Sequence, residues 1–372
     1  MRVESIRPFI MHIPVTGSQI ADSTHRISHW GVVGARIRSS DGIEGFGFTG
    51  THAQLESDRL IARLISDVYA PMVTGRSLQD YQSTWQDLFR APPIQWIGRA
   101  GLTQLALSAI DVALWDLRAK RAGEPLWSLL GGAHADRVRA YNTDVGWLSL
   151  DQSELVDMCA RACQQEGFTG VKIKVGQENP EHDVRRVEAV RKAVGPDVTI
   201  AIDANGRFDL PTALRLSQRL EPYDVLWFEE PMWYDDVEAH ARLARLTRIP
   251  IALGEQIYTV ESLSQFMLRG AVQFVQPDVT RIGGVTPFLR AIAAASAQSL
   301  QVAPHAGEMS QVHVHIAFHS SSCSVLEYIP WIRQCFLDPA TVRDGWFVKP
   351  EMPGAGTTPT EESLERYGRP VD

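Results

Sequence analysis

The chain has 372 residues, of which 44% are hydrophobic and 22% are charged, and its formal net charge is −8. This length exceeds what one hydrophobic core usually supports, so we expect two domains or one large barrel with an added unit. The ordinary composition and acidic charge argue against a surface that binds nucleic acid or anionic membranes.

The N-terminus and the cysteines favour a cytoplasmic protein. Charges at Arg2, Glu4 and Arg7 interrupt any apolar segment that could act as a signal peptide. No apolar run approaches the roughly 18 residues of a membrane span. The four cysteines have neither CxxC nor zinc-type spacing, so we expect reduced thiols.

The first part of the chain, residues 1–125, is expected to form an α+β capping domain. Three β-like runs come first, at residues 3–15, 31–39 and 43–48. An Asp-Gly pair between the last two is a strong hairpin signal. The apolar period then becomes helical, most clearly over residues 102–117, and Gly123 is suited to end that helix. Strands followed by helices are typical of an α+β unit.

From about residue 137 the chain alternates short apolar runs with amphipathic segments. Eight runs are predicted to be buried strands, at residues 138–142, 171–175, 198–203, 225–229, 251–255, 274–278, 300–305 and 325–327. Amphipathic stretches such as 183–194 and 211–220 lie between them. Eight buried strands that alternate with helices favour a parallel sheet closed into a barrel.

Most of these strands end in a titratable side chain. The seven residues are Lys174, Asp203, Glu229, Glu255, Asp278, His305 and Glu327, with successive spacings of 22 to 29 residues. In a barrel such strand ends meet at one mouth, where barrel enzymes have their active sites. One acidic residue at such a place would more often be a helix N-cap. Helix capping explains poorly why seven such residues occur at regular spacings, so we predict that they form a functional ring at the barrel mouth.

Three carboxylates of the ring predict a metal site. Asp203, Glu229 and Glu255 end consecutive strands, and their charges would repel one another unless a cation lay between them. Oxygen ligands without Cys or His favour Mg²⁺ over zinc, and its coordination leaves room for substrate oxygens or water. Asn205 lies on the same side of the extended chain as Asp203 and could brace a ligand.

Two lysines are expected to share one face of their strand, because alternate strand residues point to the same side. The charge of Lys172, together with Mg²⁺, would disfavour protonation of Lys174 and allow one lysine to accept a proton. A solvated lysine pair is the alternative. Glu230 is expected to point away from Glu229 and to pair with a lysine of this strand.

Asp278 and His305 end the sixth and seventh strands. A carboxylate that binds an imidazole fixes its tautomer and raises its basicity, which would make His305 a second acid/base group opposite Lys174. A core histidine is the alternative, although the register with the ring favours function. A helical stretch carries three further histidines that we expect to be packing or surface residues: His313, His315 and His319.

With these motifs the chain resembles the enolase superfamily, mandelate racemase subgroup, over nearly its whole length. The matching segments are VKIKVG, AIDAN, WFEEP, LGEQ, QPDVTRIGGVT, APHAG and LEY, preceded by AIDVALWDLRAKRAGEPLWSLLGG. The resemblance implies an α/β fold with a modified TIM barrel, (β/α)7β, over residues 126–330. Residues 331–372 would return to the α+β capping domain.

The resemblance also implies roles for the ring. The Mg²⁺ ligands would be Asp203, Glu229 and Glu255. Lys174 would be one acid/base, and the pair of His305 and Asp278 the other. Lys172 would neutralise the substrate carboxylate, and Glu327 would donate a hydrogen bond to it. The shared step is removal of the proton α to a carboxylate, which gives a Mg²⁺-stabilised enediolate. Barrels of this kind commonly self-associate, so we expect a homo-oligomer.

The cap loops help to choose a reaction, because two opposed acid/base groups permit either racemisation or β-elimination. Residues 21–30 and 48–53 are rich in polar side chains, which suits a polyol better than an aryl group. We therefore predict a Mg²⁺-dependent dehydratase that converts an acid sugar, aldonate or aldarate, to a 2-keto-3-deoxy acid. The expected substrate contacts are His25, His29, Trp30, Thr49, Asn205 and Glu255.

Several alternatives stay open at this point. A racemase or epimerase of a 2-hydroxy acid is the second candidate, and a non-catalytic sensor of acid sugars is a third. Either Lys174 or His305 could take the α-proton, depending on the substrate's stereochemistry. Arg99 or Arg281 could bind the distal carboxylate of a diacid.

Overall fold

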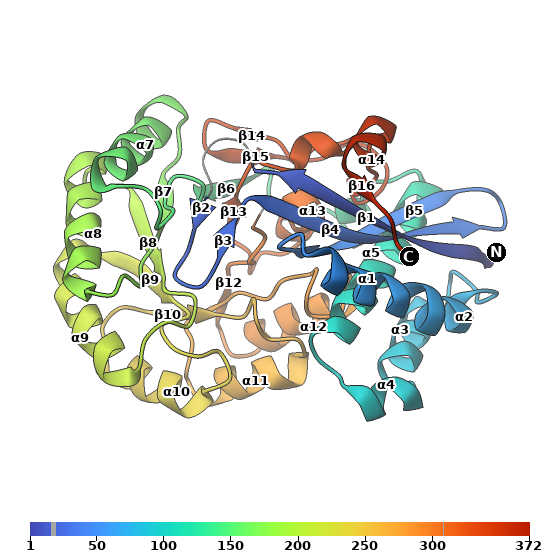
Figure 1. The fold of residues 1–372 in the computed structure, drawn as a ribbon, viewed down its shortest axis with the longest axis horizontal. Coiled ribbons are helices and arrows are strands. Elements are labelled where there is room, and N and C mark those ends of the chain that lie inside the picture. The colour runs from blue at the N-terminus through green and yellow to red at the C-terminus, as the bar shows by residue number, and fades with distance from the viewer. Residues whose placement is uncertain (16–19, 308) are drawn as a thin grey trace.

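The computed structural model describes residues 1–15, 20–307 and 309–372. Figure 1 shows two parts: a barrel, coloured green to orange, and a cap built on the blue N-terminal strands. Both chain termini lie at the cap. Within the described ranges no helix has the length and apolar character needed to cross a membrane.

Eight parallel strands form the barrel. They are β6 (Arg137–Asn142), β7 (Gly170–Lys174), β8 (Thr199–Asp203), β9 (Val225–Glu229), β10 (Ile251–Leu253), β11 (Phe274–Val275), β12 (Gln301–Val302) and β13 (Val325–Tyr328). Neighbours pair in order from β6 to β12, and β13 pairs with β6. A parallel bridge between Val302 and Cys323 joins β12 to the residues before β13. The predicted (β/α)7β barrel is therefore confirmed.

Among the described residues, seven helices surround the barrel, and several of them are visible along its outer edge in Figure 1. They are α7 (Gln152–Gln165), α8 (Pro180–Val194), α9 (Leu210–Leu220), α10 (Val237–Leu246), α11 (Val260–Leu268), α12 (Val285–Ser296) and α13 (Ser310–His319). Side-chain N-caps begin α7 to α11 and come from Asp151, Asn179, Asp209, Asp236 and Thr259. None of these caps belongs to the predicted ring, so capping does not explain the ring residues.

Three barrel strands are shorter than predicted. β10, β11 and β12 end at Leu253, Val275 and Val302. The ring residues Glu255, Asp278 and His305 therefore lie on loops just beyond the strands. The prediction was wrong here because the next residues stop the ladder: Gly254 has φ of 154°, and Pro277 and Pro304 have no backbone N–H to donate.

The cap contains an antiparallel sheet in the order β16-β1-β4-β5. Its strands are β1 (Val3–Pro14), β4 (His29–Ser39), β5 (Glu44–Thr51) and β16 (Gly368–Arg369). The helical elements are α1 (Leu55–Arg63), η1 (Leu64–Tyr69), α2 (Ala70–Val73), α3 (Tyr81–Phe89), α4 (Pro92–Ile97) and α5 (Leu102–Ala122). The β4–β5 hairpin turns at the predicted Asp-Gly pair, where Gly42 has φ of 86°.

The C-terminal segment contacts both parts of the molecule. Its strands β14 (Val342–Arg343) and β15 (Trp346–Val348) form a hairpin that pairs with β6 of the barrel. Helix α14 (Glu361–Tyr367) then packs on β1, and β16 joins the cap sheet beside that strand. This segment thereby ties the cap to the barrel.

Helix α5 lies between the cap sheet and the barrel. Gly47 of β5 approaches it so closely that a Cβ there would lie 2.2 Å from the carbonyl oxygen of Ala109. On the barrel side, Asp111 accepts hydrogen bonds from the backbone N–H and the hydroxyl of Thr286 in α12. Burial raises the pKa of Asp111 to about 7 despite these bonds. The predicted helix end at Gly123 is confirmed by its φ of 72°.

Candidate active site

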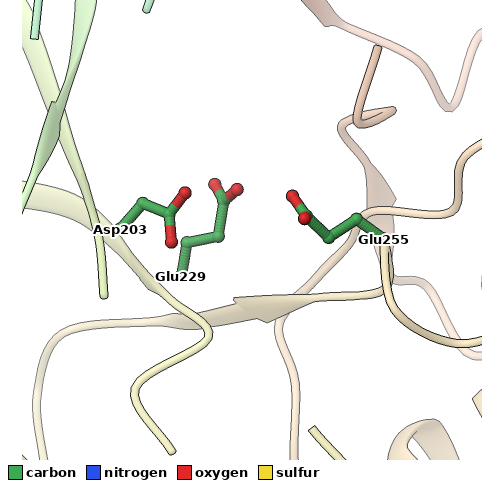
Figure 2. Close-up of side chains that lie close together, drawn as sticks. All are labelled: Asp203, Glu229 and Glu255. Atoms are coloured by element: carbon green, nitrogen blue, oxygen red, sulfur yellow. The ribbon is translucent and has the colours of Figure 1, made fainter. Parts of the chain in front are cut away.

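Three carboxylates converge at the barrel mouth. Asp203 and Glu229 are the last residues of β8 and β9, and Glu255 follows β10. One oxygen of each lies within 4.8 Å of the others, and all three side chains are buried. Figure 2 shows the carboxylates of Asp203 and Glu229 side by side, with Glu255 reaching toward them from the opposite side.

The surroundings of these carboxylates fit a cation. Burial raises the pKa of Glu229 to about 7, even though Lys172 lowers it. The neighbouring Glu230 is 1% exposed, and neither of its carboxylate oxygens has a hydrogen-bond partner in the described protein. Burial and the charge of Glu255 raise the pKa of Glu230 well above its usual range. Oxygen donors in so negative a pocket suit Mg²⁺.

Glu230 does not pair with a lysine, so that prediction was wrong. Its φ is +39°, a left-handed conformation that ends the strand alternation on which the prediction depended. Lys172 instead donates to Glu229 Oε1 at 2.7 Å and lies 2.8 Å from Glu327 Oε1. Glu230, the second carboxylate of the EEP motif, therefore lies near the three converging carboxylates without a cationic partner of its own.

Carboxylates surround both lysines of β7. Lys174 Nζ donates to Asp203 Oδ2, and to Asn205 Oδ1 at 3.1 Å. Burial lowers the pKa of Lys174, but the charges of Asp203, Asp22 and Glu255 together raise it above its usual range. Burial also lowers the pKa of Lys172, but Glu229 and Glu327 raise it. Repulsion between the two ammonium groups therefore does not make either lysine neutral in this arrangement. A cation bound by the carboxylates would offset the negative charge that stabilises these protons.

Asp278 and His305 form the predicted pair. His305 Nδ1 lies 2.7 Å from Asp278 Oδ2, and the other oxygen of Asp278 accepts from the backbone N–H and the hydroxyl of Thr280 at 2.7 and 2.8 Å. With Nδ1 bound to this fixed carboxylate, Nε2 faces the cavity, 3.0 Å from Glu255 Oε2. Burial lowers the pKa of His305, but Glu255 and Asp278 raise it well above its usual range.

The additional histidines pack behind this pair, in keeping with the expectation from sequence. His313 is buried. Its Nε2 lies 3.0 Å from the backbone nitrogen of Val279 and 3.1 Å from Asp278 Oδ1, and its Nδ1 lies 3.1 Å from the Met309 carbonyl oxygen. Burial lowers the pKa of His315 to about 3, which makes it a neutral core residue.

Glu327 of β13 closes the ring between β12 and β6. It accepts hydrogen bonds from Thr143 Oγ1 at 2.6 Å and from the backbone N–H of Gly307 at 2.8 Å. Burial would raise the pKa of Glu327, but Lys172 and His305 lower it. In this arrangement Glu327 accepts hydrogen bonds, and its role as a hydrogen-bond donor to the substrate carboxylate stays a prediction.

The ring opens into a cavity between the barrel mouth and the cap. Barrel residues in its wall include Lys174, Asn205, Glu255, Arg281, His305 and Glu327. Cap residues include Asp22, His25, Trp30, Thr51 and His52. Asp22 and His25 lie in the turn between the short strands β2 (Ile20–Ala21) and β3 (Arg26–Ile27). The candidate acid/base residues Lys174 and His305 thus share one cavity with Glu255 and the polar cap loops.

Two family models match the chain. The mandelate racemase / muconate lactonizing enzyme N-terminal domain matches residues 6–131, and the enolase C-terminal domain-like model matches residues 154–363. This chain belongs to the enolase superfamily, mandelate racemase subgroup. The resemblance inferred from the strand-end motifs is therefore confirmed.

Two relatives and one solved structure within this superfamily are dehydratases. L-talarate/galactarate dehydratase of Salmonella typhimurium is 34% identical over 351 residues, which cover 94% of this chain and 86% of the relative. Arabinonate dehydratase of Saccharolobus solfataricus is 31% identical, with 90% of each protein covered. L-Talarate dehydratase from Polaromonas sp. JS666, complexed with Mg and L-glucarate, superposes with a TM-score of 0.89 at 34% identity, over 99% of this chain and 98% of that one.

Not all predicted substrate contacts of this superfamily member reach the cavity. Four residues line it: His25, Trp30, Asn205 and Glu255. His29 is exposed on β4, with its Nδ1 3.1 Å from Ser28 Oγ. Thr49 is fully buried and donates to the carbonyl oxygen of Thr280 at 2.8 Å. His29 is next to Trp30 in β4, Thr49 is next to Gly50 in β5, and neighbouring strand residues point to opposite faces. The structure therefore places His29 and Thr49 outside the cavity.

Sequence reasoning missed several cap residues of the wall, among them Asp22, Thr51 and His52. These three lie in the polar segments that suggested a polyol substrate, but no period indicated which side chains face inward. Arg281 lines the cavity, 3.6 Å from Glu255 Oε1 and 3.8 Å from Asp278 Oδ2. Arg99, the other candidate for a distal carboxylate, is exposed and does not form part of the wall.

Proposed function

We propose that this protein is a Mg²⁺-dependent dehydratase that converts an aldonate or aldarate to a 2-keto-3-deoxy acid. One observation carries the proposal: three converging carboxylates lie between Lys174 and the pair of His305 and Asp278, and the two acid/base groups open into the same cavity. The dehydratase relatives support this choice of reaction.

The cation site would be formed by Asp203, Glu229 and Glu255. A bound divalent cation supplies positive charge that stabilises the substrate's carboxylate oxygens as the α-proton leaves. Magnesium in the Polaromonas dehydratase complex supports this assignment. Lys172, fully buried behind Glu229 and Glu327, would add positive charge on the same side.

The protein's own groups would move the protons. Lys174 Nζ or His305 Nε2 removes the proton from C2, depending on the configuration at that carbon, and the C2–H electron pair enters the enediolate. The C3–O bond then breaks, and the leaving hydroxide takes a proton from His305 to become water. The resulting enol gains a proton at C3 and loses the proton of its C2 hydroxyl, which gives the 2-keto-3-deoxy acid.

Turnover of a substrate library tests this function. Hexonates, pentonates and aldarates are incubated with enzyme and Mg²⁺, and 2-keto acid is measured with and without a chelator. We expect product from a subset of acid sugars and its loss on chelation. Product that survives complete chelation would contradict the metal role, and a library without any product would overturn the dehydratase proposal.

Racemisation is the second candidate, because Lys174 and His305 could remove and return a proton on opposite faces of C2. A reaction in D₂O separates the two activities. Deuterium at C2 of recovered, undehydrated substrate, without 2-keto acid, would favour the racemase or epimerase.

A further inference from the structure

At the barrel end of the cavity, the contacts of Glu229 differ from those of the other two converging carboxylates. Lys174 Nζ donates to Asp203, and His305 Nε2 lies 3.0 Å from Glu255 Oε2. These contacts involve the candidate acid/base groups, whose protonation changes in the proposed reaction. Within the described ranges, Glu229 has neither a hydrogen bond nor an ion pair with Lys174 or His305. Its hydrogen bonds therefore do not depend on the protons that move.

Three other donors bind Glu229. Lys172 Nζ donates to Oε1 at 2.7 Å. Trp227 Nε1 and Gln276 Nε2 both donate to Oε2, at 2.9 and 2.8 Å. A carboxylate oxygen has roughly two acceptor sites. Oε2 is therefore filled, whereas Oε1 keeps one site that a cation can occupy.

Trp227 belongs to the interior of the barrel. It lies two residues before Glu229 on β9, and alternate strand residues point to the same side. Its ring packs against Tyr141 with a centroid distance of 5.4 Å. Three small residues complete this buried cluster: Ala201, Ala252 and Ala303. The indole N–H is thus a polar group of an otherwise apolar layer, and Glu229 is its acceptor.

Gln276 reaches the same carboxylate oxygen from just after β11. It is 1% exposed, and its Oε1 has no hydrogen-bond partner in the described protein. Leaving a buried amide oxygen unpaired costs free energy. The amide cannot turn to relieve this, because a carboxylate only accepts and needs the NH₂ group. An apolar side chain of similar size would fill the space without that cost, so packing alone does not explain Gln276.

The adjacent carboxylate, Glu230, lacks comparable donors. It is as buried as Glu229, at 1% and 0% exposed. Neither of its oxygens has a hydrogen-bond partner among the described residues. The donors of the barrel interior thus distinguish the two glutamates of the EEP motif.

We propose that Trp227 and Gln276 are positioning residues that fix Glu229 as a cation ligand: they fill Oε2 and leave Oε1 to bind the cation. This inference rests on the cation site of the proposed function and adds two residues that move no proton. An indole N–H and an amide do not titrate near neutral pH. They therefore hold Glu229 in the same way in every protonation state of Lys174 and His305.

The experiment measures Mg²⁺ binding to the metal-free protein by isothermal titration calorimetry, without substrate. Gln276→Met keeps a side chain of similar length and removes the donor. We expect its Kd for Mg²⁺ to rise about 10- to 100-fold, the usual effect of losing a hydrogen bond to a metal ligand. Trp227→Phe should act in the same direction. In the dehydration assay, the Mg²⁺ concentration for half-maximal rate should rise, while kcat at saturating Mg²⁺ changes less than Kd does.

Two matched controls lose a hydrogen bond outside the cation site. Gln273→Met removes the side-chain acceptor of the Ile251 backbone N–H. Trp115→Phe removes the indole donor to Thr286 Oγ1. Both should lower the thermal unfolding temperature of the metal-free protein and leave Kd for Mg²⁺ unchanged, which is the result of a purely structural hydrogen bond.

Three results would overturn the inference: Gln276→Met and Trp227→Phe bind Mg²⁺ as tightly as the unmodified protein, the controls weaken binding as much as these variants, or both variants fail to fold while the controls fold. Failure of the cation site gives a different result, because then the unmodified protein does not bind Mg²⁺. Failure of the dehydratase function is seen separately, as Mg²⁺ binding without 2-keto acid from any acid sugar.

Discussion

The barrel end and the cap end of the cavity are built in different ways. At the barrel end, strand pairing sets the positions of the ring residues: Lys174 is in register with Asp203, and Asp203 with Glu229. At the cap end, the turn that carries Asp22 and His25 is fixed by its own short-range hydrogen bonds. We therefore expect a change in the turn to alter the wall of the cavity without changing the strand pairing.

The largest effect is expected at the barrel end, from Glu229→Gln. This change removes one of three converging charges and a ligand oxygen, so kcat/KM should fall to below about one-thousandth. The assay is formation of 2-keto acid at saturating Mg²⁺. Glu261→Gln is the matched control, because Glu261 is exposed on α11 and pairs with Arg290 of α12 at 3.1 Å. Equal activities of the two variants would contradict the assignment.

His305→Asn should lower kcat by about 10²- to 10⁴-fold, the usual contribution of a positioned general acid or base. The exposed His29 is the matched control, since His29→Asn leaves the cavity wall unchanged. A His305→Asn variant that releases product at the native rate would remove the Asp278–His305 pair from the mechanism.

Asp278→Asn should have a smaller effect, about 10- to 100-fold, because Asp278 acts through His305. Asp278 raises the pKa of His305, so the ionisation of His305 in the pH profile of kcat/KM should move to lower pH in the variant. A purely structural role would lower activity without this displacement.

The smallest predicted effect lies between the two ends, where α5 meets the barrel. Burial raises the pKa of Asp111 in the folded state to about 7. The contribution of Asp111 to the unfolding free energy is therefore present below about pH 4 and is lost as pH rises through 7. Over that window the loss is at most about 1.4 kcal/mol per pH unit. Asp111→Asn should remove this pH-dependent part, measured as the difference in unfolding free energy between pH 5 and 8. An Asp111→Asn variant whose unfolding free energy has the same pH dependence as the unmodified protein would contradict this prediction.

The barrel end could be predicted from the sequence because one geometric rule governs it. Each βα unit returns the chain to the same mouth, so residues such as Lys174 and His305, far apart in sequence, were found by spacing alone. Protonation could not be predicted in this way. The state of Lys174 depends on Asp203, Asn205 and Asp22, which only the folded chain brings close to it.

The cap end shows where the reasoning failed. Polar composition identified the correct loops but could not distinguish Trp30, which faces the cavity, from its neighbour His29, which does not.

At the barrel, the prediction for Glu230 from strand alternation was wrong, because its φ of +39° ends that alternation. Such positions depend on turns and strand register that a single sequence does not specify.

The most direct test of the account is a crystal structure grown with Mn²⁺ in place of Mg²⁺, with the ion located by its anomalous scattering. We expect one peak at the barrel mouth that is coordinated by an oxygen from each of Asp203, Glu229 and Glu255 and is lost in Glu229→Gln. A protein that binds Mn²⁺ elsewhere, or leaves these three carboxylates without an ion at saturating Mn²⁺, would contradict it.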